Sequence, residues 1–141
     1  MLRLLAACAL MAVCVSIHAG GLAWSLRWLR RAADTPLRFL PDLRLFIRVA
    51  IWIVVLHFVE IIAWALLFTW RGALPDFSTA VYFSAVTYTT TGYGDVVLPE
   101  RWRLSSAVEA LTGILMCGWS TGFFFAVVSR MYEAPREPSQ R

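Results

Sequence analysis

Hydrophobic residues gather in three long runs along the chain, separated by stretches that carry most of the arginines. The runs cover residues 4–26, 49–69 and 105–129, and few polar side chains interrupt them. A helix rises about 1.5 Å per residue, so each run is long enough to cross the roughly 30 Å hydrocarbon core of a bilayer. The pattern therefore predicts three transmembrane helices.

A fourth apolar run, 77–89, is too short to span a membrane as a helix. Asp76 or Ser78 can cap the free backbone N–H groups at its start. Gly92 and Gly94 follow its end and are typical of a chain leaving a helix. We predict a re-entrant helix that enters the membrane, ends there, and is followed by a polar loop that leads back out.

Composition supports the membrane assignment. Of the 141 residues, 60% are hydrophobic and only 16% are charged, whereas soluble domains average about 45–50% apolar and about 25% charged residues. A short chain is mostly surface and has little interior in which to bury this excess. The bilayer is the expected solvent, and membrane lipids are the expected surroundings.

The arginines indicate the orientation. Six lie near the first connection, namely Arg27, Arg30, Arg31, Arg38, Arg44 and Arg48. The region 71–103 has three arginines, offset by three acidic residues. By the positive-inside rule, the first connection and the C-terminus are cytoplasmic. The net charge of +4 thus reflects topology, and no nucleic acid is expected as a partner because no basic stripe carries interleaved aromatic residues.

The first run has a second interpretation, since Arg3 before an apolar stretch is also typical of a signal peptide. A cut after Ala19 would place Ile17 where signal peptidase requires a small residue. Cleavage would also leave an arginine-rich linker without a helix before it. We therefore favour a retained helix.

No enzymatic chemistry is indicated. The sequence shows no nucleophile–base pair, no metal-ligand spacing and no phosphate-binding glycine loop, and its two histidines are far apart in the chain. We predict a protein that is not an enzyme and that uses no cofactor.

The stretch TYTTTGYGDVV, residues 87–97, carries the candidate chemistry. Non-helical backbone at membrane depth is tolerated only where it is buried in protein or lines a water-filled cavity. Alternating glycines permit positive φ angles, which let successive carbonyls point the same way. A ring of carbonyls, with the Thr90 hydroxyl, can replace the hydration shell of a cation. One chain supplies one wall of such a ring, so several copies must surround the axis.

These residues resemble the selectivity filter of potassium channels, usually Thr-Val-Gly-Tyr-Gly-Asp, with Thr91 at the valine position. The likeness extends over about 49–130, and FSAVTYTTTGYGD is especially similar to bacterial members. The resemblance implies a homotetramer in which the carbonyls of four residues bind dehydrated K⁺, the permeant ion. These residues are Thr90, Thr91, Gly92 and Tyr93, and the Thr90 side chain completes the innermost site.

The resemblance also assigns supporting residues. It implies that Gly94 and Asp95 shape the outer mouth and that Tyr82 and Phe83 match the aromatic cuff that braces the filter. Val86 stands where some members of the family place a glutamate behind the filter, so Asp95 lacks that partner.

Thr91 is the departure with the largest consequence. The side chain at this position is normally apolar and packs away from the pore, so the Thr91 hydroxyl can rearrange the packing behind the filter. A channel that discriminates weakly between K⁺ and Na⁺ is therefore the alternative function. An alternative of another class is a non-conducting membrane scaffold with a relic filter.

The last run contains two candidate hinge glycines for gating. Gly118 lies in CGWST, which resembles the stretch around the family's hinge, whereas Gly113 better fits the usual distance from the filter. Close helix packing through Gly118 and Gly122, a small-xxx-small pattern, is the alternative.

Two polar residues of the second run form a candidate intramembrane pair. His57 and Glu60 are three apart and share one helix face. A carboxylate near mid-bilayer must face protein, and its candidate partners are His57, His18 or a hydroxyl of the short helix. The pair either links gating to pH or fixes helix rotation through a structural hydrogen bond. Glu109 either reaches behind the filter or reaches interfacial water.

The sequence therefore predicts an all-α membrane protein, a subunit of a tetrameric K⁺ channel with a re-entrant pore helix and a filter loop. An added N-terminal helix (1–29) and a basic cytoplasmic linker (30–48) precede the pore domain (49–130), and a short cytoplasmic tail (131–141) follows it. The expected location is a bacterial inner membrane.

Overall fold

The computed structural model describes residues 1–32 and 39–132, with side chains placed for 1–27 and 43–129. The described residues form helices and loops without any strand. The helices are α1 (Leu2–Ala32), α2 (Phe39–Trp70), α3 (Phe77–Tyr88) and α4 (Arg103–Tyr132), and a single 3₁₀ turn, η1 (Glu100–Trp102), leads into α4.

Three of these helices are long and apolar enough to cross a membrane. The candidate spans are Leu2–Arg27, Leu43–Trp70 and Glu100–Ser129. The predicted all-α membrane protein with three spanning helices is therefore confirmed.

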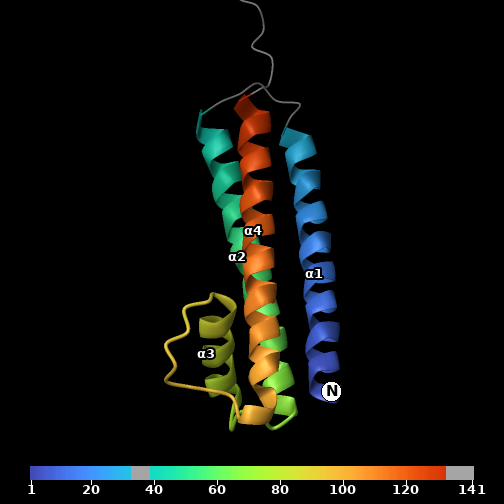
Figure 1. Cartoon of the computed structure of the whole chain (residues 1–141). Helices are drawn as coiled ribbons and strands as arrows, with labels where there is room; N and C mark the ends of the chain where they lie inside the picture. The colour runs from blue at the N-terminus through green and yellow to red at the C-terminus, as the bar shows by residue number, and fades with distance from the viewer. Residues whose placement is uncertain (33–38, 133–141) are drawn as a thin grey trace, which may run out of the picture.

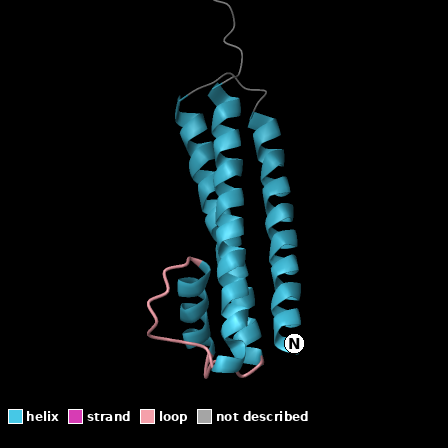
Figure 2. Cartoon of the chain, viewed as in Figure 1, coloured by secondary structure: helices cyan, strands magenta, loops and turns pink. Residues whose placement is uncertain are grey.

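The long helices α1, α2 and α4 run side by side, and the short helix α3 lies at one end of this bundle (Figure 1). α3 packs against α2 and α4, while α1 packs against α2 and α4 along their length. The N-terminus lies at the same end as α3. The long loop between α3 and α4 bulges away from the bundle at that end (Figure 2).

Both long helices at the first connection extend further than the apolar pattern predicts. The predicted linker 30–48 is helical at both of its ends, since α1 continues to Ala32 and α2 begins at Phe39. Pro41 lies in the first turn of α2, where a missing N–H removes no helical hydrogen bond. The hydrophobic run marks the part of a helix that suits lipid, and the helix itself continues beyond it. The tail after Tyr132 and residues 33–38 lie outside the described residues.

Aromatic side chains form the core at the α3 end of the bundle. The Phe68 ring of α2 meets Phe83 of α3 edge-on, with ring centroids 5.6 Å apart, and meets Trp102 at 6.1 Å. Trp64 and Tyr88 are also buried in this cluster. Burial of these large side chains fixes α3 against α2, and thereby positions the loop that follows α3.

Candidate functional site

The start of α3 is fixed by a capping aspartate. Asp76 Oδ1 accepts a hydrogen bond from the Thr79 backbone N–H at 2.8 Å, and its Oδ2 accepts one from the Thr79 hydroxyl at 2.7 Å. The Thr79 N–H holds the pKa of Asp76 below its ordinary value. Of the two predicted capping residues, Asp76 is the N-cap, and Ser78 lies inside the first turn.

The loop TTTGYGD (89–95) leaves α3 through hydrogen bonds to the last turn of the helix. The Thr90 N–H donates to the Thr87 carbonyl at 2.9 Å. The N–H groups of Thr91 and Gly92 both donate to the Val86 carbonyl, at 2.9 and 3.2 Å. Val86 therefore anchors the loop through its backbone, whatever its side chain contributes.

Positive φ angles alternate along this loop. They occur at Thr90 (59°), Gly92 (58°) and Gly94 (78°). Glycine adopts this region at little cost, but a β-branched residue does not, and such a residue costs on the order of 1–3 kcal/mol. The loop thus keeps the alternation of positive φ angles even at Thr90, where the backbone is strained.

The hydroxyl of Thr91 has a defined partner behind the loop. The Thr89 hydroxyl donates to the Ala85 carbonyl at 2.7 Å, and the Thr89 and Thr91 hydroxyl oxygens are 2.9 Å apart. Because the Thr89 proton is engaged with Ala85, Thr91 is the donor in the second bond. The Thr91 side chain therefore continues the hydrogen bonding of the α3 end rather than being left without a partner.

The aromatic residues predicted to support the loop have different environments. Tyr82 is exposed, and its hydroxyl donates to Asp95 Oδ2 at 2.6 Å, whereas Phe83 is buried against Phe68. The partner of Asp95 is thus Tyr82, one turn before Val86 on the same helix. This bond lowers the pKa of the Asp95 carboxyl and raises the pKa of the Tyr82 phenol.

Replacing Tyr82 with phenylalanine is expected to raise the pKa of Asp95 toward its ordinary value of about 3.9, because the hydroxyl that stabilises the carboxylate is removed. In the native protein the lowered pKa of Asp95 stabilises the fold at pH values above that ordinary pKa. This stabilisation is lost as the pH falls through the lowered pKa. The raised pKa of Tyr82 adds stability below about pH 10, which is lost as pH rises through the raised value. Carboxyl ¹³C NMR during acid titration measures the shift, and an unmoved Asp76 signal is the internal control. An unchanged Asp95 midpoint would show that the bond does not form.

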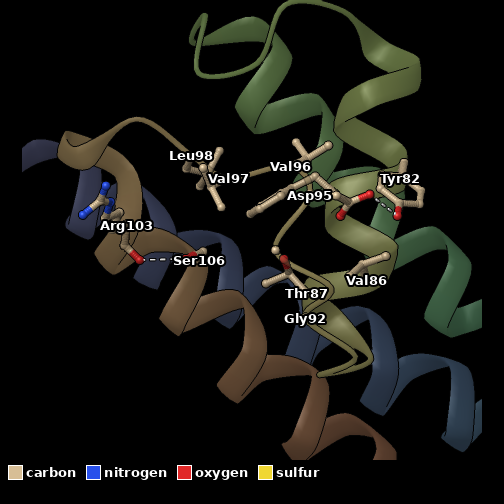
Figure 3. A pocket seen from close by; sticks show the side chains of 12 residues that line it. Tyr82, Val86, Thr87, Gly92, Asp95, Val96, Val97, Leu98, Arg103 and Ser106 are labelled. Carbon is tan, nitrogen blue, oxygen red and sulfur yellow. Dashed lines mark hydrogen bonds between the residues drawn. The ribbon is translucent and has the colours of Figure 1, made fainter.

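A hollow of about 350 Å³ lies between α3, the loop and the start of α4 (Figure 3). Tyr82 and Asp95 border it on the α3 side, and Arg103 and Ser106 border it on α4. The Ser106 hydroxyl donates to the Arg103 carbonyl at 2.8 Å. The hollow separates the outer part of the loop from α4 within one chain.

The two candidate hinge glycines have different surroundings. A Cβ at Gly113 would collide with the backbone carbonyl of Tyr88, so α4 packs closely against the end of α3 there. Apart from the neighbouring turns of α4 itself, no described residue has an atom within 4 Å of a Cβ built at Gly118 or Gly122. The hinge assignment remains a prediction for both Gly113 and Gly118, but Gly113 has a packing role that Gly118 lacks within one chain.

Five buried or half-buried polar side chains from all four helices meet in the middle of the bundle, and we call them the polar ring. Its members are His18 of α1, His57 and Glu60 of α2, Tyr88 of α3 and Ser120 of α4. Glu60 Oε1 is 2.9 Å from His18 Nδ1, and its Oε2 accepts from the Tyr88 hydroxyl. The two histidines are distant in the chain, but their ring centroids are only 5.2 Å apart.

The remaining contacts close the polar ring. Ser120 Oγ lies 2.9 Å from His18 Nε2 and 3.2 Å from His57 Nε2, and His57 Nδ1 lies 3.1 Å from the Tyr88 hydroxyl oxygen. Glu60 thus has both predicted kinds of partner, a histidine of α1 and a hydroxyl of α3. Its nearest approach to His57 is 3.8 Å. Ser120 was missed, because a serine in an apolar run has no pattern that distinguishes it from a packing residue.

Glu109 of α4 is fully buried and lies beside the Ser84 hydroxyl of α3, but no hydrogen bond of ordinary geometry joins its carboxylate oxygens to a described residue. The interpretation that it reaches interfacial water is therefore wrong for the single chain. Glu109 stands apart from the polar ring and shares none of its hydrogen bonds.

Comparison with known proteins identifies the family. No curated protein and no solved structure matches the chain. A protein family described as Ion channel matches residues 52–130, more than half of the chain. The match covers most of α2 and all of α3, the TTTGYGD loop and the spanning part of α4. The chain belongs to this ion channel family.

Proposed function

We propose that the chain is one subunit of a homotetrameric channel that conducts K⁺ passively across a membrane. In this proposal α3 is a re-entrant pore helix and residues 90–94 are the selectivity filter. One observation carries the proposal, namely the alternation of positive φ at Thr90, Gly92 and Gly94 directly after a short helix set between two candidate spans.

The alternation of positive φ angles along the loop suits the binding of desolvated cations. It lets the carbonyls of successive residues face one side, where they can replace the water around an ion. The C-terminal end of α3 carries a partial negative charge that also favours a cation near the start of the loop. Strain at Thr90 supports a functional role for the conformation, because strained backbone persists where the surrounding structure over-determines it.

The exposure of the loop supports assembly. Residues 89–95 are all exposed in the single chain, and irregular backbone facing lipid would leave polar groups without hydrogen-bond partners. Further copies of the chain around a central axis would remove these groups from lipid and complete the ring of carbonyls. Exposed apolar residues of α4, including Leu111, Ile114 and Leu115, are available for such contacts.

The arginines support a cytoplasmic C-terminus. Arg27, Arg44 and Arg48 lie at the end of the bundle opposite α3. The α3 end carries acidic residues beside its arginines, including Asp76 and Asp95. By the positive-inside rule the α3 end faces outward, and a bacterial inner membrane is the proposed location.

A Thr91→Val variant is expected to retain K⁺ conduction with an equal or higher K⁺ over Na⁺ permeability ratio. Valine has nearly the same shape, the Thr91 carbonyl is unchanged, and only the bond to the Thr89 hydroxyl is lost, which is worth about 1 kcal/mol. The permeability ratio measured in planar bilayers checks this. A marked fall in the ratio would show that the hydroxyl, rather than the backbone, sets selectivity.

The proposal is tested by reconstituting the purified full chain in liposomes. Native mass spectrometry should show four copies per particle, and a K⁺ gradient should drive K⁺ flux. Tetramers that pass Na⁺ as readily as K⁺ would favour the weakly selective channel. Monomers without flux would favour the scaffold.

A further inference from the structure

The polar ring is a closed cycle of hydrogen-bond contacts. In order, it runs from Glu60 to His18, to Ser120, to His57, to Tyr88 and back to Glu60. Each histidine uses both ring nitrogens, and Glu60 uses both carboxylate oxygens. Five contacts close the cycle, so five protons are needed if every contact is to be a hydrogen bond.

The ordinary protonation states supply one proton too few. An ionised carboxylate offers none, and two neutral imidazoles, one serine hydroxyl and one tyrosine hydroxyl offer four in total. One contact would then join two lone pairs, and the ring would carry a buried negative charge. His18, Glu60 and Tyr88 are fully or almost fully buried. Water therefore cannot readily stabilise either the missing hydrogen bond or the negative charge.

One additional proton removes both defects. The fifth proton completes the fifth hydrogen bond and brings the net charge of the ring to zero, whether it sits on Glu60 or on a histidine. A sixth proton would give a positive charge and set two donors against each other at one contact. The geometry is therefore matched to one bound proton.

We propose that the polar ring is a buried binding site for a single proton, and that this proton holds α1, α2, α3 and α4 together at the centre of each subunit. Tyr88 and Ser120 remain protonated hydroxyls, while Glu60 and the two histidines share the bound proton. The other titratable groups facing Glu60 are the thiols of Cys14 on α1 and Cys117 on α4.

The position of the ring connects its proton to the loop and to α4. Tyr88 is two residues before Thr90, and Ser120 is two residues after Gly118. Loss of the proton leaves one of the five contacts of the ring without a hydrogen bond, and this weakens the link between the loop and α4. The effect on conduction rests on the proposed function, whereas the proton site itself does not.

A metal ion is the competing ligand, because ligand atoms of His18, His57 and Glu60 lie within 4.8 Å of one another. Binding an ion there would require both histidines to release hydrogen bonds that the ring already makes. The closed cycle of hydrogen bonds therefore favours a bound proton, and metal binding is one of the outcomes that the test distinguishes.

The test uses ¹⁵N-histidine labelling of the full chain in lipid bilayers. His18 and His57 are the only histidines of the chain, so every side-chain signal reports on the ring. As pH rises from about 5 to about 10, we expect both histidines to change together in one step with a common midpoint. Independent titration of the two histidines would overturn the proposal.

A Glu60→Gln variant supplies the missing proton covalently. The amide can accept from His18 and donate to Tyr88, so neutral histidines complete all five hydrogen bonds with zero charge. The shared step should therefore be lost in Glu60→Gln and retained in the control Glu109→Gln, which changes the buried carboxyl outside the ring. A step that persists unchanged in Glu60→Gln would overturn the proposal.

A second variant tests the closed cycle without altering a titratable group. Ser120→Ala removes the link between the two histidines, and they should then titrate at different midpoints. Retention of a common midpoint in this variant would overturn the cycle. Displacement of the ¹⁵N signals by equimolar Zn²⁺ at neutral pH would identify a metal site instead.

K⁺ flux measured in liposomes tests the effect of the proton on conduction separately from the existence of the proton site. K⁺ flux of the native protein should change at the midpoint of the NMR step, and Glu60→Gln should lose that pH dependence. A normal NMR step in a protein without flux would retain the proton site and reject the proposed function.

Discussion

A Gly92→Ala variant is expected to lose at least nine-tenths of the K⁺ flux, a tenfold or larger effect, which corresponds to about 1.4 kcal/mol. Gly92 has a φ of 58°, and an L-residue there costs roughly 1–2 kcal/mol. Apart from its two chain neighbours, no described residue of the same subunit has an atom within 4 Å of a Cβ at this position, so within one subunit the effect comes from the backbone. Thr90 is already strained, and a second strained residue would let the loop relax and redirect its carbonyls. K⁺ flux per assembled particle in liposomes measures the loss.

Gly72→Ala is the matched control. Gly72 also has a positive φ, 62°, and apart from its chain neighbours no described residue has an atom within 4 Å of a Cβ built there, but it lies in the turn between α2 and α3. The variant should lose a similar amount of stability and keep its flux. Equal losses of flux in Gly72→Ala and Gly92→Ala would mean that strain acts through general stability, and the filter assignment would lose its support.

Gly113→Ala is expected to have the largest effect on stability. The added Cβ would meet the Tyr88 carbonyl, which is backbone and cannot rotate away. Overpacking of this kind costs about 1–3 kcal/mol and occasionally more. Since Tyr88 ends α3, the displacement should also disturb the loop and the polar ring. Chemical unfolding in detergent, followed by circular dichroism, measures the change in the free energy of unfolding.

Gly20→Ala provides the comparison for this variant. Gly20 lies within α1, and no described residue outside its own helical turns has an atom within 4 Å of a Cβ built there. Alanine is favoured over glycine in helices by about 1 kcal/mol, so this substitution should be neutral or stabilising. If Gly113→Ala unfolded at the same denaturant concentration as Gly20→Ala, the close approach of α4 to α3 would be contradicted.

The long helices and α3 could be predicted because their signals are local. Hydrophobic runs locate the spanning helices, and Asp76 marks the start of α3 through a hydrogen bond to Thr79, three residues later. The ends of α1 and α2 could not be predicted in the same way. Outside the hydrocarbon core, arginines such as Arg44 are as compatible with a helix as with a loop, so the apolar pattern does not mark where α1 ends or where α2 begins.

The site could be predicted only in part, because some of its contacts join distant positions. The loop residues follow from the glycine spacing, and the His57–Glu60 pair follows from helical spacing. In contrast, His18 is 42 positions from Glu60 and 102 positions from Ser120. Only the packing of α1 and α4 beside α2 brings these side chains together, and the hydrophobic pattern does not specify which helix faces meet.

The most direct test of the K⁺ channel proposal is the reversal potential of the reconstituted full chain in planar bilayers, with KCl on one side and NaCl on the other. If residues 90–94 form a potassium filter, the potential should lie far toward the K⁺ equilibrium potential, and the current should fall at least tenfold in Gly92→Ala. A current that reverses near zero would contradict K⁺ selectivity.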